Sequence, residues 1–235
     1  MKKIATLILS LLAGSEVYAQ GANKENYFDG IYGQVEVGFG SLTNKTTLAP
    51  TAVPLSVDTS FGSTNLQSAI TVGYSREIVD FAGTDYDINL AANISYNFTN
   101  GNSGNQTYNI LGNSVGFSTT TKNILAFSVE PGYYLSKDSI IYAKFGYAQG
   151  QSNYQNTISS VNVNIGTQRG PLFGFGFKHG FTEVHPNIYW GIEAYQINFN
   201  AKTTTFNSPA LEGTSVNITS KPTLLFGKLH LGYIF

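Results

Sequence analysis

The stretch Thr223 to Phe235 reads TLLFGKLHLGYIF, and its side chains alternate between two kinds. Counted back from the end, one face is apolar and contains Phe235, Tyr233, Leu231, Leu229 and, beyond Gly227, Leu225. The other face contains Lys228, His230 and Gly232. A period of two indicates a β-strand with two different surroundings. A long apolar row that ends in an aromatic residue and is backed by a polar row is typical of a transmembrane barrel strand, with lipid outside and a polar lumen inside.

The composition of the 235-residue chain favours the same interpretation. Charged residues make up only 11% and aromatic residues 14%, whereas soluble globular proteins carry roughly 25% charged residues. No apolar run approaches the roughly 18 residues that a membrane helix needs. A soluble β-sandwich, the alternative, would carry more surface charge. Cysteine is absent, which excludes disulfides and thiolate chemistry.

The N-terminus has the pattern of a secretory signal peptide. Met1-Lys2-Lys3 is a positive region, Ile4 to Leu12 is an apolar region, and Val17-Tyr18-Ala19 supplies the small residues of a cleavage site before Gln20. The apolar run is too short to be a membrane anchor. The sequence therefore predicts a signal peptide over residues 1–19, export through the Sec pathway, and a barrel domain over residues 20–235.

Seven further segments show the alternation of the last one, which predicts eight strands: Phe28–Gly40, Ser68–Arg76, Asp85–Phe98, Asn123–Leu135, Ile140–Gln149, Leu172–His179, Ile188–Phe199 and Thr223–Phe235. The connections alternate between short and long, and the long ones are rich in Ser, Thr, Asn and Gly. The predicted fold is all-β: an eight-stranded antiparallel up-and-down transmembrane β-barrel with short periplasmic turns and four long extracellular loops.

Three positions interrupt the pattern. Arg76 breaks an outward apolar row, so the strand is expected to bulge or end there. Pro131 removes a ladder donor and predicts a local bulge. In 188–199 the side-chain parity stays open, because a lumen-facing Glu193 would also turn Ile197 and Phe199 inward unless a bulge intervenes.

The chain resembles the small outer-membrane β-barrel proteins of the OmpA-like and opacity type, a porin-like superfamily of Gram-negative surface antigens. The resemblance rests on YFDGIYGQVEVGFG near the start, IYAKFGY in the fifth strand and GKLHLGYIF at the end. It implies an outer-membrane location and a recognition signal for the barrel-assembly machinery, formed by Leu229, Leu231, Tyr233 and Phe235.

Four acids and four bases fall on the expected lumen face: Glu36, Arg76, Asp87, Glu130, Lys144, Lys178, Glu193 and Lys228. An unpaired charge in a narrow interior is costly, so these groups are expected to pair and plug the lumen. The alternative is an ion pathway or proton relay. Because the first and last strands close the barrel, Lys228 is the expected partner of Glu36.

The outer loops carry more bases than acids. Lys122, Arg169 and Lys221 each precede a strand that descends into the membrane, and they are hypothesised to form a rim that pairs with lipopolysaccharide phosphates. A solvated loop base is the alternative. The other expected partners are outer-membrane lipid and, through the loops, a host or cell-surface ligand. A monomer without a nucleic-acid partner is expected.

No catalytic, cofactor or metal site is predicted. His179 and His185 fall at the third periplasmic turn and His230 faces the lower lumen, so none lies near the outer leaflet, where a base and a nucleophile would meet substrate. Three functions remain in competition: a structural or surface-recognition protein with a plugged lumen, which is the first choice, a small-solute pore, and a lipid-modifying enzyme.

Overall fold

The computed structural model of the protein describes residues 27–50, 57–78, 87–110, 113–156, 162–181, 185–208 and 214–235. The predicted signal peptide lies outside these residues. Eleven strands occur in them: β1 (Gly30–Pro50), β2 (Val57–Ile78), β3 (Ile88–Asn97), β4 (Gly101–Asn102), β5 (Gln106–Ile110), β6 (Asn113–Ser136), β7 (Ser139–Asn156), β8 (Asn162–Gly180), β9 (Ile188–Asn198), β10 (Lys202–Ser208) and β11 (Thr214–Ile234). The described part of the chain has no helix long and apolar enough to cross a membrane.

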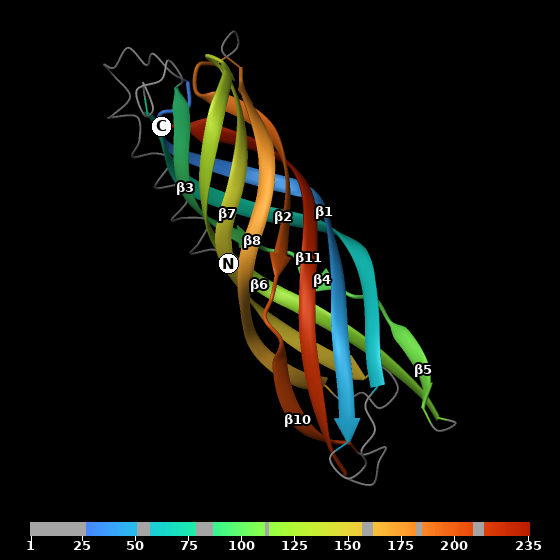
Figure 1. Ribbon diagram of the computed structural model, residues 1–235. Coiled ribbons are helices and arrows are strands. Elements are labelled where there is room, and N and C mark those ends of the chain that lie inside the picture. The colour runs from blue at the N-terminus through green and yellow to red at the C-terminus, as the bar shows by residue number, and fades with distance from the viewer. Residues whose placement is uncertain are drawn as a thin grey trace, which may run out of the picture.

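The strands form a closed antiparallel barrel. The ring runs β1-β2-β3-β6-β7-β8-β9-β11 and closes by pairing of β11 with β1, which makes eight positions (Figure 1). The short strands β4 and β5 pair with β6 beyond the end of β3, and β10 pairs with β11 beyond the end of β9. The predicted all-β, eight-stranded, up-and-down barrel is therefore confirmed.

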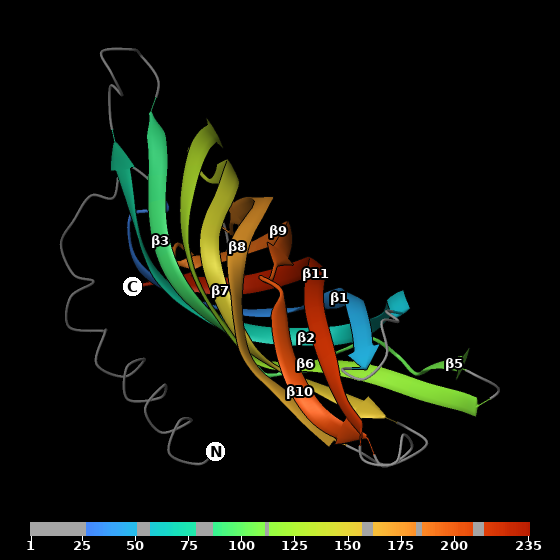
Figure 2. The same cartoon turned by 60° about the horizontal axis from the view of Figure 1, so that its bottom comes forward.

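The strands extend well beyond the predicted ones on the outer side. β1, β2 and β6 have 21, 22 and 24 residues, whereas about 9–11 residues suffice to cross a membrane. The segments expected as loops between 41 and 67 and between 150 and 170 are mostly strand. Their Ser, Thr and Asn residues fit a strand that faces water as well as they fit a loop, so composition alone did not separate the two. The outer connections are hairpins that carry the barrel wall outward (Figures 1 and 2).

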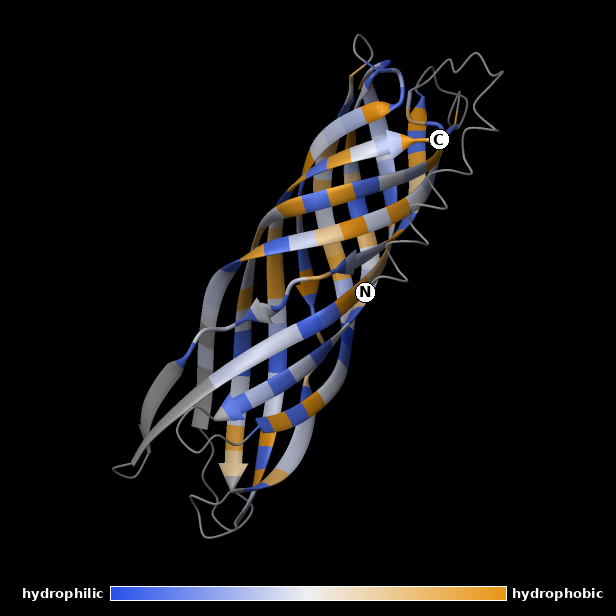
Figure 3. Cartoon of the chain, turned by 180° about the vertical axis from the view of Figure 1, so that it is seen from behind, coloured by the Kyte–Doolittle hydropathy of each residue, from blue (hydrophilic) through white to orange (hydrophobic). Residues whose placement is uncertain are grey.

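A band of exposed apolar side chains surrounds the barrel. Phe39, Phe127, Phe175 and Leu229 are 64%, 54%, 66% and 57% exposed, and similar side chains occur on every strand of the ring. Apolar and polar residues alternate along these strands (Figure 3). Beyond the band the outward side chains become polar, as at Lys45. An outward apolar band on a closed barrel, with a polar extension above it, is the surface of a transmembrane β-barrel.

The bulge expected at Pro131 is absent. Val129 pairs with Phe145 and Gly132 with Tyr142, so the β6–β7 register is the same on both sides of the proline. The register shifts instead between Lys122 and Leu125, where Asn123 has a φ of 53°. Asn tolerates this left-handed conformation better than most residues, which makes it a suitable bulge position.

The structure also decides the two other irregularities of the sequence pattern, at Arg76 and in 188–199. β2 continues to Ile78 with an unshifted register against β3, so the strand neither bulges nor ends at Arg76. β9 pairs with β11 without a shift, and Glu193, Ile197 and the following Phe199 all point inward. The lumen is therefore not lined by polar residues throughout.

Candidate functional site: the filled lumen

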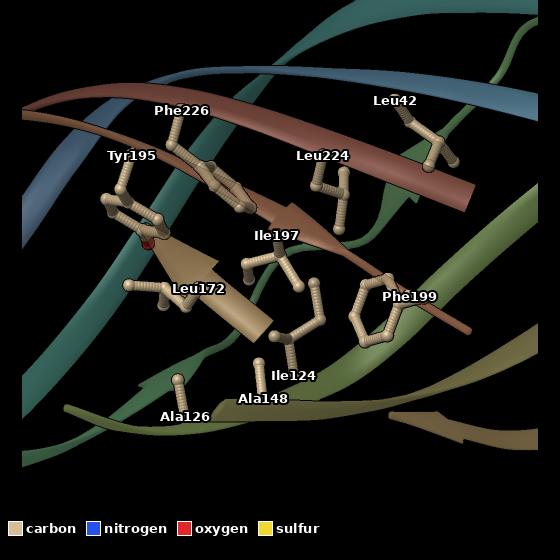
Figure 4. Close-up of a cluster of buried hydrophobic side chains, with 10 residues drawn as sticks. All are labelled: Leu42, Ile124, Ala126, Ala148, Leu172, Tyr195, Ile197, Phe199, Leu224 and Phe226. Carbon is tan, nitrogen blue, oxygen red and sulfur yellow. The ribbon is translucent and has the colours of Figure 1, made fainter. Parts of the chain in front are cut away.

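The lumen is filled by side chains in successive layers. At the periplasmic end, aromatic and aliphatic residues form an inner apolar layer: Phe28, Tyr32, Ala91, Ile140, Tyr189 and Ile234. Next comes a layer of buried charges. Beyond it lies a middle apolar layer, which consists of Leu42, Ile124, Ala126, Ala148, Leu172, Tyr195, Ile197, Phe199, Leu224 and Phe226 (Figure 4). A polar layer around Asn44 and an outer apolar layer around Tyr154 and Ile165 follow.

The charged layer is an ion-pair cluster of three acids and three bases. Lys144 Nζ lies 2.7 Å from Glu193 Oε2 and 3.4 Å from Glu130 Oε1, and Lys178 Nζ lies 2.7 Å from Glu130 Oε2. Lys228 Nζ lies 2.8 Å from Glu36 Oε2. All six residues are at most 4% exposed. The charges balance within the cluster, as buried ions require.

Aromatic rings hold the three lysines in place. The Lys178 ammonium lies 4.8 Å from the centroid of the Tyr32 ring and 4.6 Å from that of Tyr142. Lys144 and Lys228 share the Tyr195 ring, at 5.0 and 5.1 Å from its centroid. These distances are within the range of favourable cation–π contacts, which gain strength when the cation is desolvated.

Neutral side chains complete the coordination of the carboxylates. Glu36 accepts hydrogen bonds from Gln34 (3.0 Å) and Thr71, and Glu130 accepts one from Asn93 (2.7 Å). Tyr142 donates to Glu193 over 3.1 Å. Several donors hold the Glu36 and Glu130 carboxylates in one position, whereas Glu193 Oε1 has no hydrogen-bond partner among the described residues.

Two of the eight residues expected in the lumen lie outside the cluster. Arg76 is exposed on the exterior of β2 opposite Leu90, because the unbroken alternation that points Ser75 inward points Arg76 outward. Asp87 is half-buried and precedes β3 at the periplasmic end of the barrel. It therefore lies below the cluster. The expectation that Arg76 faces the lumen is wrong, whereas Asp87 has the inward parity of Asn89. Without Arg76 and Asp87 the cluster still contains equal numbers of acids and bases.

The apolar layers were missed by sequence reasoning. A polar lumen was expected, yet Leu172, Ile197 and Leu224 have no exposed surface and point inward. The alternation of side chains along each strand already carries this information. In 188–199 every second residue from Glu193 onward includes Ile197 and Phe199, and every second residue before Lys228 includes Leu224. The alternation was followed only where it gave polar residues inside.

His230 is the remaining titratable residue of the lumen. It is 4% exposed, packs against the Tyr189 ring at 6.0 Å and lies over Gly191, and neither ring nitrogen has a hydrogen-bond partner among the described residues. Lys178 and Glu36 are its charged neighbours in the strand register. A continuous relay would need hydrogen bonds from this ring to the cluster, and the described residues supply none.

A serine, a histidine and an aspartate meet at the periplasmic turn between β7 and its neighbours. Ser139 Oγ lies 2.8 Å from His179 Nδ1, and Ser136 donates to Asp138 over 2.6 Å. The hydrogen bond from Ser136 lowers the pKa of Asp138. Asp138 accepts a hydrogen bond of 3.3 Å from the Ser139 hydroxyl, whereas in a hydrolase triad the acid accepts a hydrogen bond from the imidazole. The described residues also contain no group of side chains suited to a metal ion.

The three rim cations are on separate strands. Lys122 pairs in register with Gln151 on β7, and Arg169 on β8 pairs with Gln149. β7 therefore separates them. Lys221 on β11 lies directly opposite Lys45 on β1. The structure brings Lys221 together with Lys45, which the sequence did not indicate, and leaves Lys122 and Arg169 apart from this pair.

Comparison with known proteins identifies the fold. OprG from Pseudomonas aeruginosa is similar with a TM-score of 0.52 and 10% identity, over 90% of this chain and 98% of that one. The chain has the fold of the small outer-membrane β-barrel proteins. OmpT from Escherichia coli, an outer membrane protease, gives a TM-score of 0.48 at 11% identity over 88% and 97% of the two chains, and Ail from Yersinia pestis gives 0.38 at 9% over 86% and 99%. No family model and no curated protein sequence matches the chain.

Proposed function

We propose that the protein is a closed structural barrel of the outer membrane that presents four strand hairpins to the exterior for envelope integrity, adhesion or recognition. The observation that carries this proposal is the order of layers in the lumen: a neutral ion-pair cluster between two apolar layers. An ion or solute would have to cross both apolar layers and displace buried ion pairs, which costs several kcal/mol per ion. This supports a plugged lumen over a small-solute pore.

Single-channel recording in planar bilayers tests the closed lumen. The mature chain is expected to show no sustained conductance near neutral pH. Sustained single-channel events would overturn the closed barrel and favour the pore. A control with Lys137→Gln, a substitution at the exposed periplasmic turn, should behave like the parent protein, which guards against conductance from membrane defects.

Protease treatment of whole cells tests the display of the hairpins. The cuts are expected only in the four outer connections, which link β1 to β2, β5 to β6, β7 to β8 and β10 to β11. Cuts in the connection between β6 and β7 would contradict the topology, because that turn lies at the periplasmic end together with the other short connections.

We also propose that the rim cations fix the barrel in the lipopolysaccharide layer. Lys122, Arg169 and Lys221 lie three or four residues outward from the exposed apolar side chains Leu125, Phe173 and Leu225. Each is thus close above the apolar band, where lipid phosphates lie, and a phosphate attracts basic side chains. Charge reversal at all three positions is expected to weaken lipopolysaccharide association. Unchanged association and unchanged barrel stability would refute the rim.

A further inference from the structure

The seam between the first and last strands carries two positive charges side by side. Lys45 and Lys221 are exposed and directly opposite each other in the β1–β11 ladder. Like charges in directly opposed positions of a sheet are destabilising. Neither lysine has an ion-pair partner among the side chains that the structure describes.

Hydroxyl groups flank this pair on both sides. Thr43 lies opposite Thr223 on the membrane side of the lysines, and Thr47 lies opposite Thr219 on the outer side. The strands concerned belong to one continuous sheet, β10-β11-β1-β2, which continues outward from the apolar band (Figure 2). Two ammonium groups in adjacent positions form a surface that matches a phosphate group, since both can donate to its oxygens.

On the membrane side of the two lysines, the outer face of the barrel lacks a side chain at Gly227. Gly227 faces outward, and a side chain added there would meet nothing within 4 Å. One row of the sheet runs from Phe39 through Gly227 and Ala194 to Phe175. The two phenylalanines are 64% and 66% exposed. Between these two large side chains, Gly227 and Ala194 leave a low stretch of the lipid-facing wall, which is called the trough below.

The distance between the lysine pair and the trough along the membrane normal matches the length of one lipid molecule. Lys221 lies six residues outward from Gly227, about 20 Å along the strand and about 15 Å along the membrane normal for a strand tilted by about 40°. A lysine side chain can bend several ångströms toward the membrane while its stem covers apolar surface. A phosphate on the lysine pair therefore sits at head-group height, and an acyl chain attached to the same molecule reaches the trough.

We propose that the β1–β11 seam binds one lipopolysaccharide molecule, with a lipid A phosphate between Lys45 and Lys221 and an acyl chain in the trough at Gly227. This inference rests on the rim part of the proposed function and narrows it from a diffuse ring to one site with one occupant. Lys45, which is not among the rim cations, contributes half of the phosphate site.

The test measures lipopolysaccharide affinity of the purified mature chain in vesicles of zwitterionic phospholipid. Lys45→Gln with Lys221→Gln is expected to lower the affinity at least tenfold. Lys137→Gln at the periplasmic turn is the charge control and should change nothing. With lipopolysaccharide whose lipid A phosphates have been removed, the double variant and the parent protein should bind equally. An unchanged affinity of the double variant for intact lipopolysaccharide would overturn the phosphate site.

The acyl-chain trough has its own variant. Gly227→Phe fills the trough from a Cβ position that meets nothing within 4 Å, and it is expected to lower the affinity for intact lipopolysaccharide but not for the water-soluble saccharide from which the acyl chains have been removed. Gly33→Phe is the matched control, because Gly33 also faces lipid and a side chain there would meet only the Phe235 ring, at 3.8 Å. Equal loss in both variants would refute a specific trough.

The affinity measurements distinguish between the rim proposal and the seam-site proposal. If Lys122→Gln with Arg169→Gln lowers the affinity while Lys45→Gln with Lys221→Gln does not, the rim stands and the seam site falls. If neither pair of substitutions has an effect, both fall. The closed lumen is unaffected by either result, since it is tested by conductance.

Discussion

Lys228 and Glu36 join the last strand to the first inside the barrel. Lys228 Nζ donates to Glu36 Oε2 over 2.8 Å although the two residues are not opposite in the ladder: Glu36 pairs with His230 and Lys228 with Gly38. The contact is diagonal, and a side chain at Gly38 would collide with the backbone of Gly227 and Lys228. Lys228 also donates to Asn97 Oδ1 on β3 over 2.8 Å. The seam that closes the barrel is therefore also fixed across the lumen.

Glu36→Gln is expected to lower the free energy of unfolding by about 3–5 kcal/mol, because it leaves Lys228 as a buried charge without its counter-ion. Lys228→Gln added to this variant should cost little more, since the double variant contains no uncompensated charge from the pair. Urea unfolding of the refolded barrel in lipid vesicles measures both. Additive losses would show that the two residues are not coupled.

Arg76→Gln serves as the comparison with Glu36→Gln, because it removes a charge outside the cluster. Arg76 is exposed on the exterior, so its substitution is expected to change the free energy of unfolding by no more than about 0.5 kcal/mol. The same urea unfolding experiment applies. A loss of the size expected for Glu36→Gln would place Arg76 in the lumen network after all.

The middle apolar layer should behave like the core of a soluble protein. Leu172→Ala and Ile197→Ala each remove a side chain with no exposed surface and are expected to cost about 2–5 kcal/mol, because a cavity remains. Leu229→Ala on the lipid face is the matched control and should cost less, since lipid refills the space. If the three variants lose equal stability, the layer does not act as a packed core.

The success of the sequence reading follows from the period of two. It located the eight strands, the six charges that meet in the cluster and the pairing of Glu36 with Lys228, because each depends mainly on which face a residue occupies. It failed at Arg76, where the polarity of one residue was preferred to its parity, and it left Ile197 open, because a bulge would have turned this residue outward. The pairing of Lys45 with Lys221 depends on strand register beyond the membrane. That register could not be read from segments whose composition resembles loops.

The pKa of Asp138 gives a pH-dependent prediction at the periplasmic turn. The hydrogen bond from Ser136 Oγ, 2.6 Å long, is the main cause that lowers this pKa, and His179 lowers it further. A depressed carboxyl pKa contributes stability above the unfolded-state pKa, and this contribution is lost as the pH falls through the folded-state value. Ser136→Ala should therefore raise the pKa of Asp138 toward its ordinary value.

Titration of the Asp138 carboxyl by NMR measures this shift. The loss of stability on acidification should begin at a higher pH in Ser136→Ala than in the parent protein. Lys137→Gln is the control, since it alters charge in the same turn without removing the donor. An Asp138 pKa that stays low in Ser136→Ala would show that the Ser136 hydroxyl does not set it.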